Sequence, residues 1–208
     1  MEPFTVISGR AAPLMQNNID TDVIIRIERL TASEQPQLGR YALEALRYLA
    51  DGSDNPDFPF NQAKYRGAPI LIAGRNFGCG SSREGAVTAL MAMGLRCVIA
   101  ESFGDIFYGN CFQNGMLPIR LAGSIVQDLV AEALVSDKPF TIDLQRPAIV
   151  TPAGKSIPFG VDTLQRESLL TGLDEIGLTL KHAEDIAAWQ SADRAARPWV
   201  WQLNGLAP

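Results

Sequence analysis

A short polar segment of the sequence carries residue types that together can bind an anion. It covers residues 74–84 and reads Gly-Arg-Asn-Phe-Gly-Cys-Gly-Ser-Ser-Arg-Glu. Ser81 and Ser82 supply two hydroxyl groups, and Arg83 supplies a planar guanidinium group that can hold a carboxylate through parallel hydrogen bonds. These three neighbours therefore predict a receptor for a carboxylate.

The same segment contains three glycines and the pattern of a helix start. Gly74, Gly78 and Gly80 allow backbone conformations in which a ligand can approach the main chain closely. Ser81, with Glu84 three residues later, matches a capping box, and the free amides and dipole of a helix start attract anions. A capped turn with a solvated arginine would explain the glycines alone. The paired serines and the arginine favour the anion-binding site.

The flanking residues predict the elements that position this segment. Residues 69–73 form an apolar run typical of a strand buried on both faces, and residues 86–93 have helical spacing. A second strand pattern at 96–100 precedes a second helical pattern at 105–112. This order predicts parallel neighbouring strands joined by crossovers, with ligands beyond their carboxyl ends.

The remaining patterns complete an α/β fold. We expect further strands at 4–10 and 117–121, and helices at 38–49, 124–135, 162–170 and 183–195, with a turn at 172–177. Three short strand patterns separated by turns, at 140–144, 148–151 and 156–159, predict an antiparallel β meander. The predicted fold class is α/β, with a largely parallel sheet, the meander and C-terminal helices.

Length and composition predict one globular domain over residues 1–208, with about 162–208 as a C-terminal helical extension. A net charge of −5 argues against general nucleic-acid binding, which depends on neutralising phosphates. The first residues lack the basic and apolar regions of a secretory signal, and no apolar run reaches membrane-spanning length. We therefore expect a cytoplasmic protein with no nucleic-acid or membrane partner.

Cysteine and histidine usage bears on metal binding. Cys79, Cys97 and Cys111 form no Cys-x-x-Cys pair, so we expect reduced thiols and no iron–sulfur cluster on this chain. Cys79 either faces the site or packs beneath the turn, and packing is favoured. His182, the one histidine, has no companion ligand nearby, which favours a structural or surface role over acid–base chemistry. We expect no metal site.

Several blocks of the sequence resemble the small subunit of isopropylmalate isomerase, also called 3-isopropylmalate dehydratase, and the swivelling domain of aconitase. The blocks are 18–25, 76–84, 100–110, 115–118 and 172–180, in the family's order and over nearly the whole chain. The resemblance implies a swivelling β/β/α three-layer domain. It also implies a heteromeric hydro-lyase of leucine biosynthesis, which interconverts 2-isopropylmalate and 3-isopropylmalate through an alkene.

The resemblance also implies roles for individual residues. Ser81, as an alkoxide, would remove and return the proton, and Asp22 would lie beside Ser81 and orient its hydroxyl. Ser82 and Arg83 would grip a carboxylate of a small dicarboxylic 2-hydroxy acid. A [4Fe-4S] cluster is expected on a separate large subunit. The supporting loop would be formed by Gly78, Cys79 and Gly80.

Two departures from the family pattern leave the substrate open. Arg26 stands where the family commonly has proline, and Arg26 and Arg29 are therefore substrate-binding candidates, although a solvated turn explains Arg26 equally well. Gly85 replaces the family's usual histidine. The alternatives are a paralogue for citramalate, dimethylmalate or homocitrate, or a non-catalytic anion-binding module. Trp199 and Trp201 in the tail either pack back on the domain or contact a partner chain.

Overall fold

The computed structural model describes residues 1–32 and 34–201. Two compact units divide the chain, the first covering Met1–Gly172 and the second beginning at Leu173. No helix in the described ranges is long and apolar enough to cross a membrane. The expected site residues all belong to the first unit.

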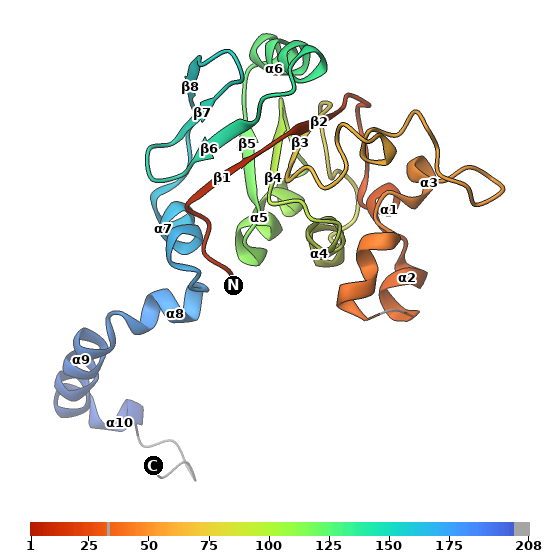
Figure 1. The fold of residues 1–208 in the computed structure, drawn as a ribbon. Coiled ribbons are helices and arrows are strands. Elements are labelled where there is room, and N and C mark those ends of the chain that lie inside the picture. Colours follow the sequence, from red (N-terminus) through yellow and green to blue (C-terminus); the bar gives the residue numbers. More distant parts are fainter. Residues whose placement is uncertain (33, 202–208) are drawn as a thin grey trace. The chain divides into compact units, whose positions relative to one another are not determined.

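A four-stranded parallel sheet forms the centre of the first unit (Figure 1). Its strands, in spatial order, are β2 (Ala11–Leu14), β3 (Ile70–Ala73), β4 (Cys97–Ala100) and β5 (Leu117–Arg120). Every residue of β3 and β4 is buried, as the apolar runs predict for strands covered on both faces. The expected parallel arrangement is therefore confirmed.

Successive strand residues contribute to two separate cores. In β3, Leu71 and Ala73 pack in the core that contains α4 (Glu84–Ala92), whereas Ile70 and Ile72 pack in the opposite core. The second core contains side chains from α6 (Gly123–Val135). This alternation is the period-two pattern of a strand, and it places helices on both faces of the sheet.

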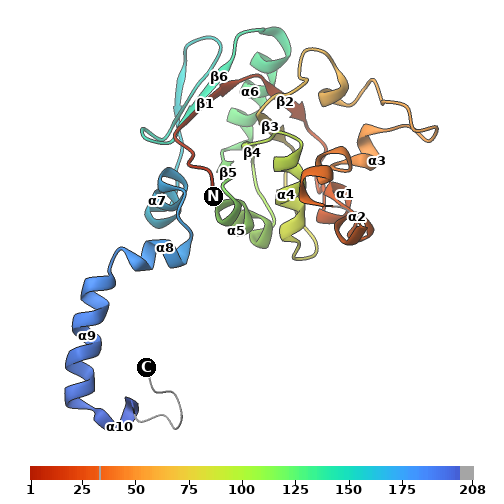
Figure 2. The same cartoon turned by 60° about the horizontal axis from the view of Figure 1, so that its bottom comes forward.

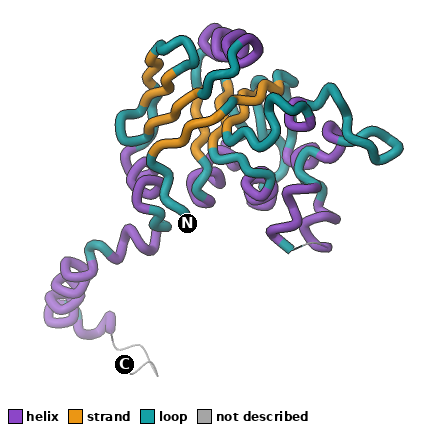
Figure 3. Tube along the Cα trace, viewed as in Figure 1, coloured by secondary structure: helices purple, strands orange, loops and turns teal. Residues whose placement is uncertain are grey.

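An antiparallel sheet forms a second β layer, visible beside the parallel one in Figure 3. Its strands, in spatial order, are β1 (Val6–Gly9), β6 (Phe140–Asp143), β7 (Ala148–Val150) and β8 (Ser156–Pro158). Phe140 and Ile142 join the core that contains Ile70 and Ile72, so this sheet covers one face of the parallel sheet. Figure 2 shows α4 and α5 (Asp105–Asn114) on the other side. The expected α/β fold with an added β layer is confirmed.

The segment between β2 and β3 is irregular, and one prediction for it is wrong. Its elements are α1 (Thr21–Ile24), α2 (Ile27–Ala32), the 3₁₀ helix η1 (Gln35–Arg40), α3 (Glu44–Arg47) and the 3₁₀ helix η2 (Pro59–Asn61). The continuous helix expected at 38–49 is broken at Leu43, which has a φ of 57°. Leu43 is buried, and its N–H donates to the carbonyl of Ile24 at 2.8 Å. This tertiary contact overrides the local helical pattern.

The C-terminal helices differ from expectation at one point. Within the first unit, α7 (Thr163–Thr171) matches the helix expected at 162–170, and the Asp162 carboxylate caps it. The second unit contains α8 (Glu175–Leu180), α9 (Ala183–Ala196) and α10 (Pro198–Trp201). The turn expected at 172–177 is wrong beyond Asp174, because this residue accepts a hydrogen bond from the Gly177 N–H and starts α8.

Candidate functional site

The candidate residues Ser81, Ser82 and Arg83 lie on the loop that joins the carboxyl end of β3 to α4. Both serines are exposed, whereas the Arg83 side chain is only 17% exposed. The position is the sheet edge at which parallel α/β folds gather their ligands. The loop therefore presents two hydroxyl groups and a partly buried guanidinium at a suitable edge.

A buried aromatic side chain and backbone hydrogen bonds hold the loop in place. The Phe77 ring is fully buried, and the backbone N–H of Phe77 donates to the carbonyl of Ser102 at 3.1 Å. Its carbonyl accepts the N–H of Gly104 at 2.9 Å, and the Gly78 N–H donates to the Ile19 carbonyl at 2.7 Å. The loop is thus tied to the turn after β4 and to the segment before α1.

Two of the predicted glycines are required by this conformation. Gly78 has a φ of 70°, and a Cβ atom there would lie 2.2 Å from the Phe107 ring. Gly80 has a φ of 92°. Only glycine adopts such angles without strain. Between them, the partly exposed Cys79 accepts the N–H of Thr21 through its carbonyl oxygen at 2.9 Å.

A pair of asparagines, to which the sequence pattern assigns no role, links the loop after β3 to the segment before α1. Asn18 and Asn76 both have left-handed backbones, with φ values of 58° and 60°. The side-chain amide of Asn76 donates to the Asn18 side-chain oxygen at 2.9 Å, and the Asn76 N–H donates to the Ser102 hydroxyl at 2.9 Å. The tolerance of asparagine for left-handed turns was the available signal.

The start of α1 carries two acidic residues, Asp20 at its N-cap and Asp22 in its first turn. The Asp20 carboxylate caps α1 by accepting the Val23 N–H at 2.7 Å. The buried Thr21 donates its hydroxyl hydrogen to the Ser81 carbonyl at 3.0 Å. Ser81 is therefore held through its backbone carbonyl, and its exposed side chain takes no part in this contact.

Arg83 joins the β3–α4 loop to α1 through its guanidinium group. Its Nη1 atom donates to Oδ1 of Asp22, which forms an ion pair, and to the carbonyl oxygen of Ile25 at 3.3 Å. In the described ranges Asp22 shares no hydrogen bond with Ser81. The role of Asp22 in orienting the Ser81 hydroxyl therefore stays a prediction.

The expected capping box is wrong. α4 begins at Glu84, its N-cap is Arg83, and no side chain forms a capping hydrogen bond. Ser81 lies two residues before that N-cap, and its carbonyl accepts the Thr21 hydroxyl. The serine hydroxyl is thus free of the capping role that the spacing predicted, although the anion-attracting start of α4 still follows Arg83 directly.

The two arginines near α2 have different environments. Nε of Arg29 donates to both carboxylate oxygens of Glu44, at 3.2 and 3.1 Å, and its guanidinium lies 4.3 Å from the centre of the Tyr41 ring. The hydrogen bond to Glu44 raises the pKa of Arg29. Arg26 is 62% exposed, and its Nε lies 3.8 Å from the same carboxylate. Arg29 is held in place, whereas Arg26 extends into solvent.

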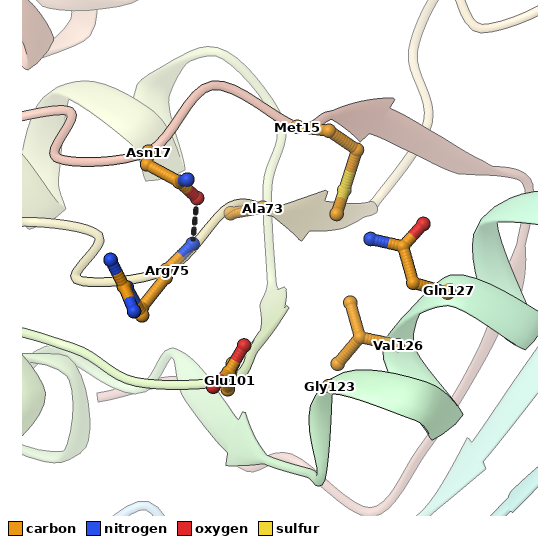
Figure 4. Close-up of a pocket in the computed structure, with 8 residues that line it drawn as sticks. All are labelled: Met15, Asn17, Ala73, Arg75, Glu101, Gly123, Val126 and Gln127. Atoms are coloured by element: carbon orange, nitrogen blue, oxygen red, sulfur yellow. Dashed lines mark hydrogen bonds between the residues drawn. The ribbon is translucent and has the colours of Figure 1, made fainter.

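A recess of about 290 Å³ lies at the same sheet edge, on the α6 side (Figure 4). Its lining residues are Met15, Asn17, Ala73, Arg75, Glu101, Gly123, Val126 and Gln127. A Cβ atom on Gly123 would lie 2.9 Å from Glu101 Oε2, so this carboxylate sits against the start of α6, where negative charge is favourable. None of the predicted site residues lines the recess.

The cysteines do not fit the ligand set of an iron–sulfur cluster. Cys97 and Cys111 are fully buried, and burial raises the pKa of both thiols, which disfavours the thiolate that a cluster needs. Cys79 lies apart from them on the site loop. No group of three or more His, Cys, Asp or Glu side chains in residues 1–32 and 34–201 is arranged to hold a metal ion.

Comparisons with known proteins give a consistent result. The model of the aconitase C-terminal domain matches residues 1–124, and that of the C-terminal domain of 3-isopropylmalate dehydratase small subunits matches residues 175–200. The 3-isopropylmalate dehydratase small subunit of Rhodospirillum centenum is 50% identical over 96% of this chain and 99% of its own length. That of Gluconacetobacter diazotrophicus is 48% identical over 98% of this chain and 99% of its own length.

A solved structure also matches. The crystal structure of 3-isopropylmalate dehydratase from Methanocaldococcus jannaschii has a TM-score of 0.62 and 31% sequence identity. The match covers 89% of this chain and 99% of the archaeal chain. The likeness therefore extends over nearly all of the archaeal protein.

Proposed function

The chain belongs to the family of 3-isopropylmalate dehydratase small subunits, and on this premise we propose that it forms a hydro-lyase with a large subunit. The complex interconverts 2-isopropylmalate and 3-isopropylmalate in leucine biosynthesis by dehydration and rehydration. The main support is the 50% sequence identity to the small subunit of Rhodospirillum centenum over nearly the full length of both chains. The loop with Ser81, Ser82 and Arg83 offers two exposed hydroxyl groups and a guanidinium group, which suit proton transfer and carboxylate binding.

Ser81 is the proposed base. Dehydration requires removal of a proton from the carbon next to a carboxylate, and Ser81 takes this proton and returns it to the neighbouring carbon during rehydration. A serine hydroxyl needs help to lose its own proton. The positive guanidinium of Arg83, two residues away, and the dipole at the start of α4 favour the negative serine oxygen.

Ser82 and Arg83 are the proposed carboxylate receptor. Both observed contacts of Arg83 use Nη1, so Nη2 can donate to a carboxylate while Asp22 and Ile25 hold the group in position. Such preorganisation reduces the loss of side-chain freedom on binding. Asp22 then contributes to catalysis chiefly by orienting Arg83.

Arg26 and Arg29 have different proposed roles in substrate binding. Arg29 is engaged with Glu44 and Tyr41, and it stabilises the segment around α2. Arg26 is the more exposed of the two, at 62% against 44%, and its ion pair with Glu44 is longer, at 3.8 Å against 3.0 Å, so it is the one proposed to reach a polar group of the substrate. Its effect on substrate binding should therefore exceed that of Arg29.

The large subunit is the proposed carrier of the [4Fe-4S] cluster. When bound there, the cluster supplies a Lewis acid for the departing hydroxyl group. The buried thiols of Cys97 and Cys111 do not fit as ligands of such a cluster. We further propose that Met1–Gly172 is the swivelling domain and that the helices from Leu173 onward are an extension of it.

Reconstitution with a large subunit of the family tests the proposal. The cluster-bearing large subunit should be retained by this chain, and the complex should interconvert the two isopropylmalates. Citramalate, dimethylmalate and homocitrate are assayed beside them. Turnover of one of these acids without turnover of isopropylmalate would indicate the paralogue. Stabilisation by malate analogues without turnover in any complex would indicate a non-catalytic module.

A further inference from the structure

Thr21, the first residue of α1, is one of two buried polar residues in the described part of the chain, and Thr151 is the other. Burial of a hydroxyl group costs free energy unless the group forms a hydrogen bond. The Thr21 hydroxyl donates to the carbonyl oxygen of Ser81 at 3.0 Å, whereas the Thr151 hydroxyl has no partner in residues 1–32 and 34–201. The buried hydroxyl of Thr21 is thus used to hold the residue that carries the proposed base.

Thr21 contacts the site loop at two points. Its backbone N–H donates to the carbonyl of Cys79 at 2.9 Å, and its hydroxyl donates to the carbonyl of Ser81, two residues further along the loop. Gly80 lies between these points, and a Cβ atom built on it would lie 3.7 Å from the Thr21 hydroxyl oxygen. The loop therefore passes over Thr21 in direct contact with it.

The Thr21 hydroxyl is the single hydrogen-bond partner of Ser81 within the described ranges. The preceding residue, Gly80, has a φ of 92°, and Ser81 itself is exposed. Because the peptide unit is planar, fixing the direction of the Ser81 carbonyl restricts the direction in which the Ser81 side chain leaves the backbone. Without the Thr21 hydroxyl, no hydrogen bond fixes that direction.

The next residue of α1 holds a different group of the site. Asp22 forms the ion pair with Arg83, and Ile25, whose N–H donates to the Thr21 carbonyl at 2.9 Å, accepts a second bond from Arg83 at 3.3 Å. The single turn of α1 thus contacts the main chain of Ser81 and the side chain of Arg83. Thr21 and Asp22 divide these two contacts between them.

We propose that Thr21 is a positioning residue for proton transfer, because its hydroxyl holds Ser81 with the serine oxygen directed to the carbon that loses the proton. This inference rests on the proposed function. Thr21 is only 1% exposed, so it acts through Ser81 and not on the substrate. Loss of its hydroxyl therefore changes kcat, whereas Asp22 acts on Arg83, the proposed carboxylate receptor.

Thr21→Val and Thr21→Ser separate the hydroxyl group from the packing of the side chain. Valine keeps the branched shape without the hydroxyl, and serine keeps the hydroxyl without the methyl group. In the complex with the large subunit, Thr21→Val should lower kcat for 3-isopropylmalate about 10²-fold and leave KM within about threefold of wild type. Thr21→Ser should keep kcat within about threefold. A side chain that only fills space would give the reverse ranking.

Thr151→Val is the matched control, because it makes the same change at the other buried threonine, whose hydroxyl has no partner in the described ranges. It should keep the kcat and KM of the wild type. The free chain supplies a measurement that does not depend on activity. The hydrogen-exchange protection of the residue 21 N–H, which donates to the Cys79 carbonyl, should fall about tenfold in Thr21→Val and stay unchanged in Thr21→Ser and Thr151→Val.

An assembled Thr21→Val complex with the kcat of the wild type, a loss confined to KM, or a lower kcat in Thr21→Ser than in Thr21→Val would overturn the proposal. Failure of the wild-type complex to turn over 3-isopropylmalate would instead contradict the proposed function. In that case unchanged protection of residue 21 in Thr21→Val would still refute the positioning role, and reduced protection would support the hold of Thr21 on the loop.

Discussion

Arg83 and Asp22 form an ion pair that joins the β3–α4 loop to α1 at the carboxyl edge of the parallel sheet. The Asp22 carboxylate is 56% exposed, and the guanidinium also contacts the Ile25 carbonyl. Asp22 therefore contacts the proposed substrate-binding group directly. A role in orienting Ser81 has no such contact to support it.

Asp22→Asn should weaken substrate binding more than it slows the chemical step. Loss of the charge frees Arg83 from one of its two contacts, so we expect KM to rise about tenfold with kcat within about threefold of wild type. Activation of Ser81 by Asp22 would instead lower kcat by about 10² or more. Steady-state kinetics of the complex distinguish these results. Asp128→Asn, an exposed carboxylate on α6, is the control.

The free energy of unfolding should change little in Asp22→Asn. Exposed ion pairs contribute about 0–1 kcal/mol, so a kinetic effect cannot be ascribed to unfolding. A loss of several kcal/mol in urea denaturation would contradict a mainly functional role for the pair.

Gly78→Ala should destabilise the chain strongly. The positive φ costs an L-residue about 1–2 kcal/mol, and forcing a methyl group against the buried Phe107 ring adds about 1–3 kcal/mol. Urea denaturation should therefore show a lower free energy of unfolding. Gly109 lies within α5, and a Cβ atom there would meet no atom within 4 Å. Gly109→Ala should therefore raise the free energy of unfolding by up to about 1 kcal/mol. Similar stabilities of the two variants would show that the loop is not held as described.

The strands and their parallel order could be predicted because strands buried on both faces appear in the sequence as continuous apolar runs. The apolar runs of β3 and β4 indicated strands covered on both faces, and both are fully buried. The glycines at 78 and 80 likewise indicated an unusual loop, and both have positive φ. In these places the local sequence and the tertiary structure favour the same conformation.

The errors arise where a distant contact overrides local spacing. Ser81 and Glu84 match a capping box, but the Thr21 hydroxyl holds the Ser81 carbonyl in the loop. Leu43 lies in a good helical pattern, yet its bond to Ile24 breaks the helix.

Alkaline pH should destabilise the chain through its two buried thiols. Burial raises the pKa of Cys97 and Cys111 above the ordinary value of 9.0, so the folded state keeps these protons while the unfolded state releases them. Stability is thus fully present below about pH 8.5 and falls as the pH rises, by up to about 1.4 kcal/mol per pH unit for each thiol. Unfolding free energies measured from about pH 8 to about pH 10 test this slope.

Cys97→Ala provides the comparison. Its stability should start lower, because a buried group is removed, but should fall less steeply with pH than that of the wild type. Parallel curves for the two proteins would contradict a contribution from Cys97. Tyr65 is common to both proteins and cancels in the comparison. The pKa of Cys111 is raised chiefly by burial, which remains in the variant, and to a lesser extent by Cys97, so that smaller part is lost with Cys97.

Replacement of Ser81 by alanine in the reconstituted complex is the most direct measurement of the proposed mechanism. Ser81 is exposed and is held through its carbonyl, so Ser81→Ala should fold, assemble with the large subunit and bind substrate. Turnover of 3-isopropylmalate should fall by about 10³ or more, because the proton acceptor is lost. Ser124→Ala, an exposed serine on α6, should keep full activity. An assembled Ser81→Ala complex with a rate close to that of the Ser124→Ala control would contradict the base role of Ser81.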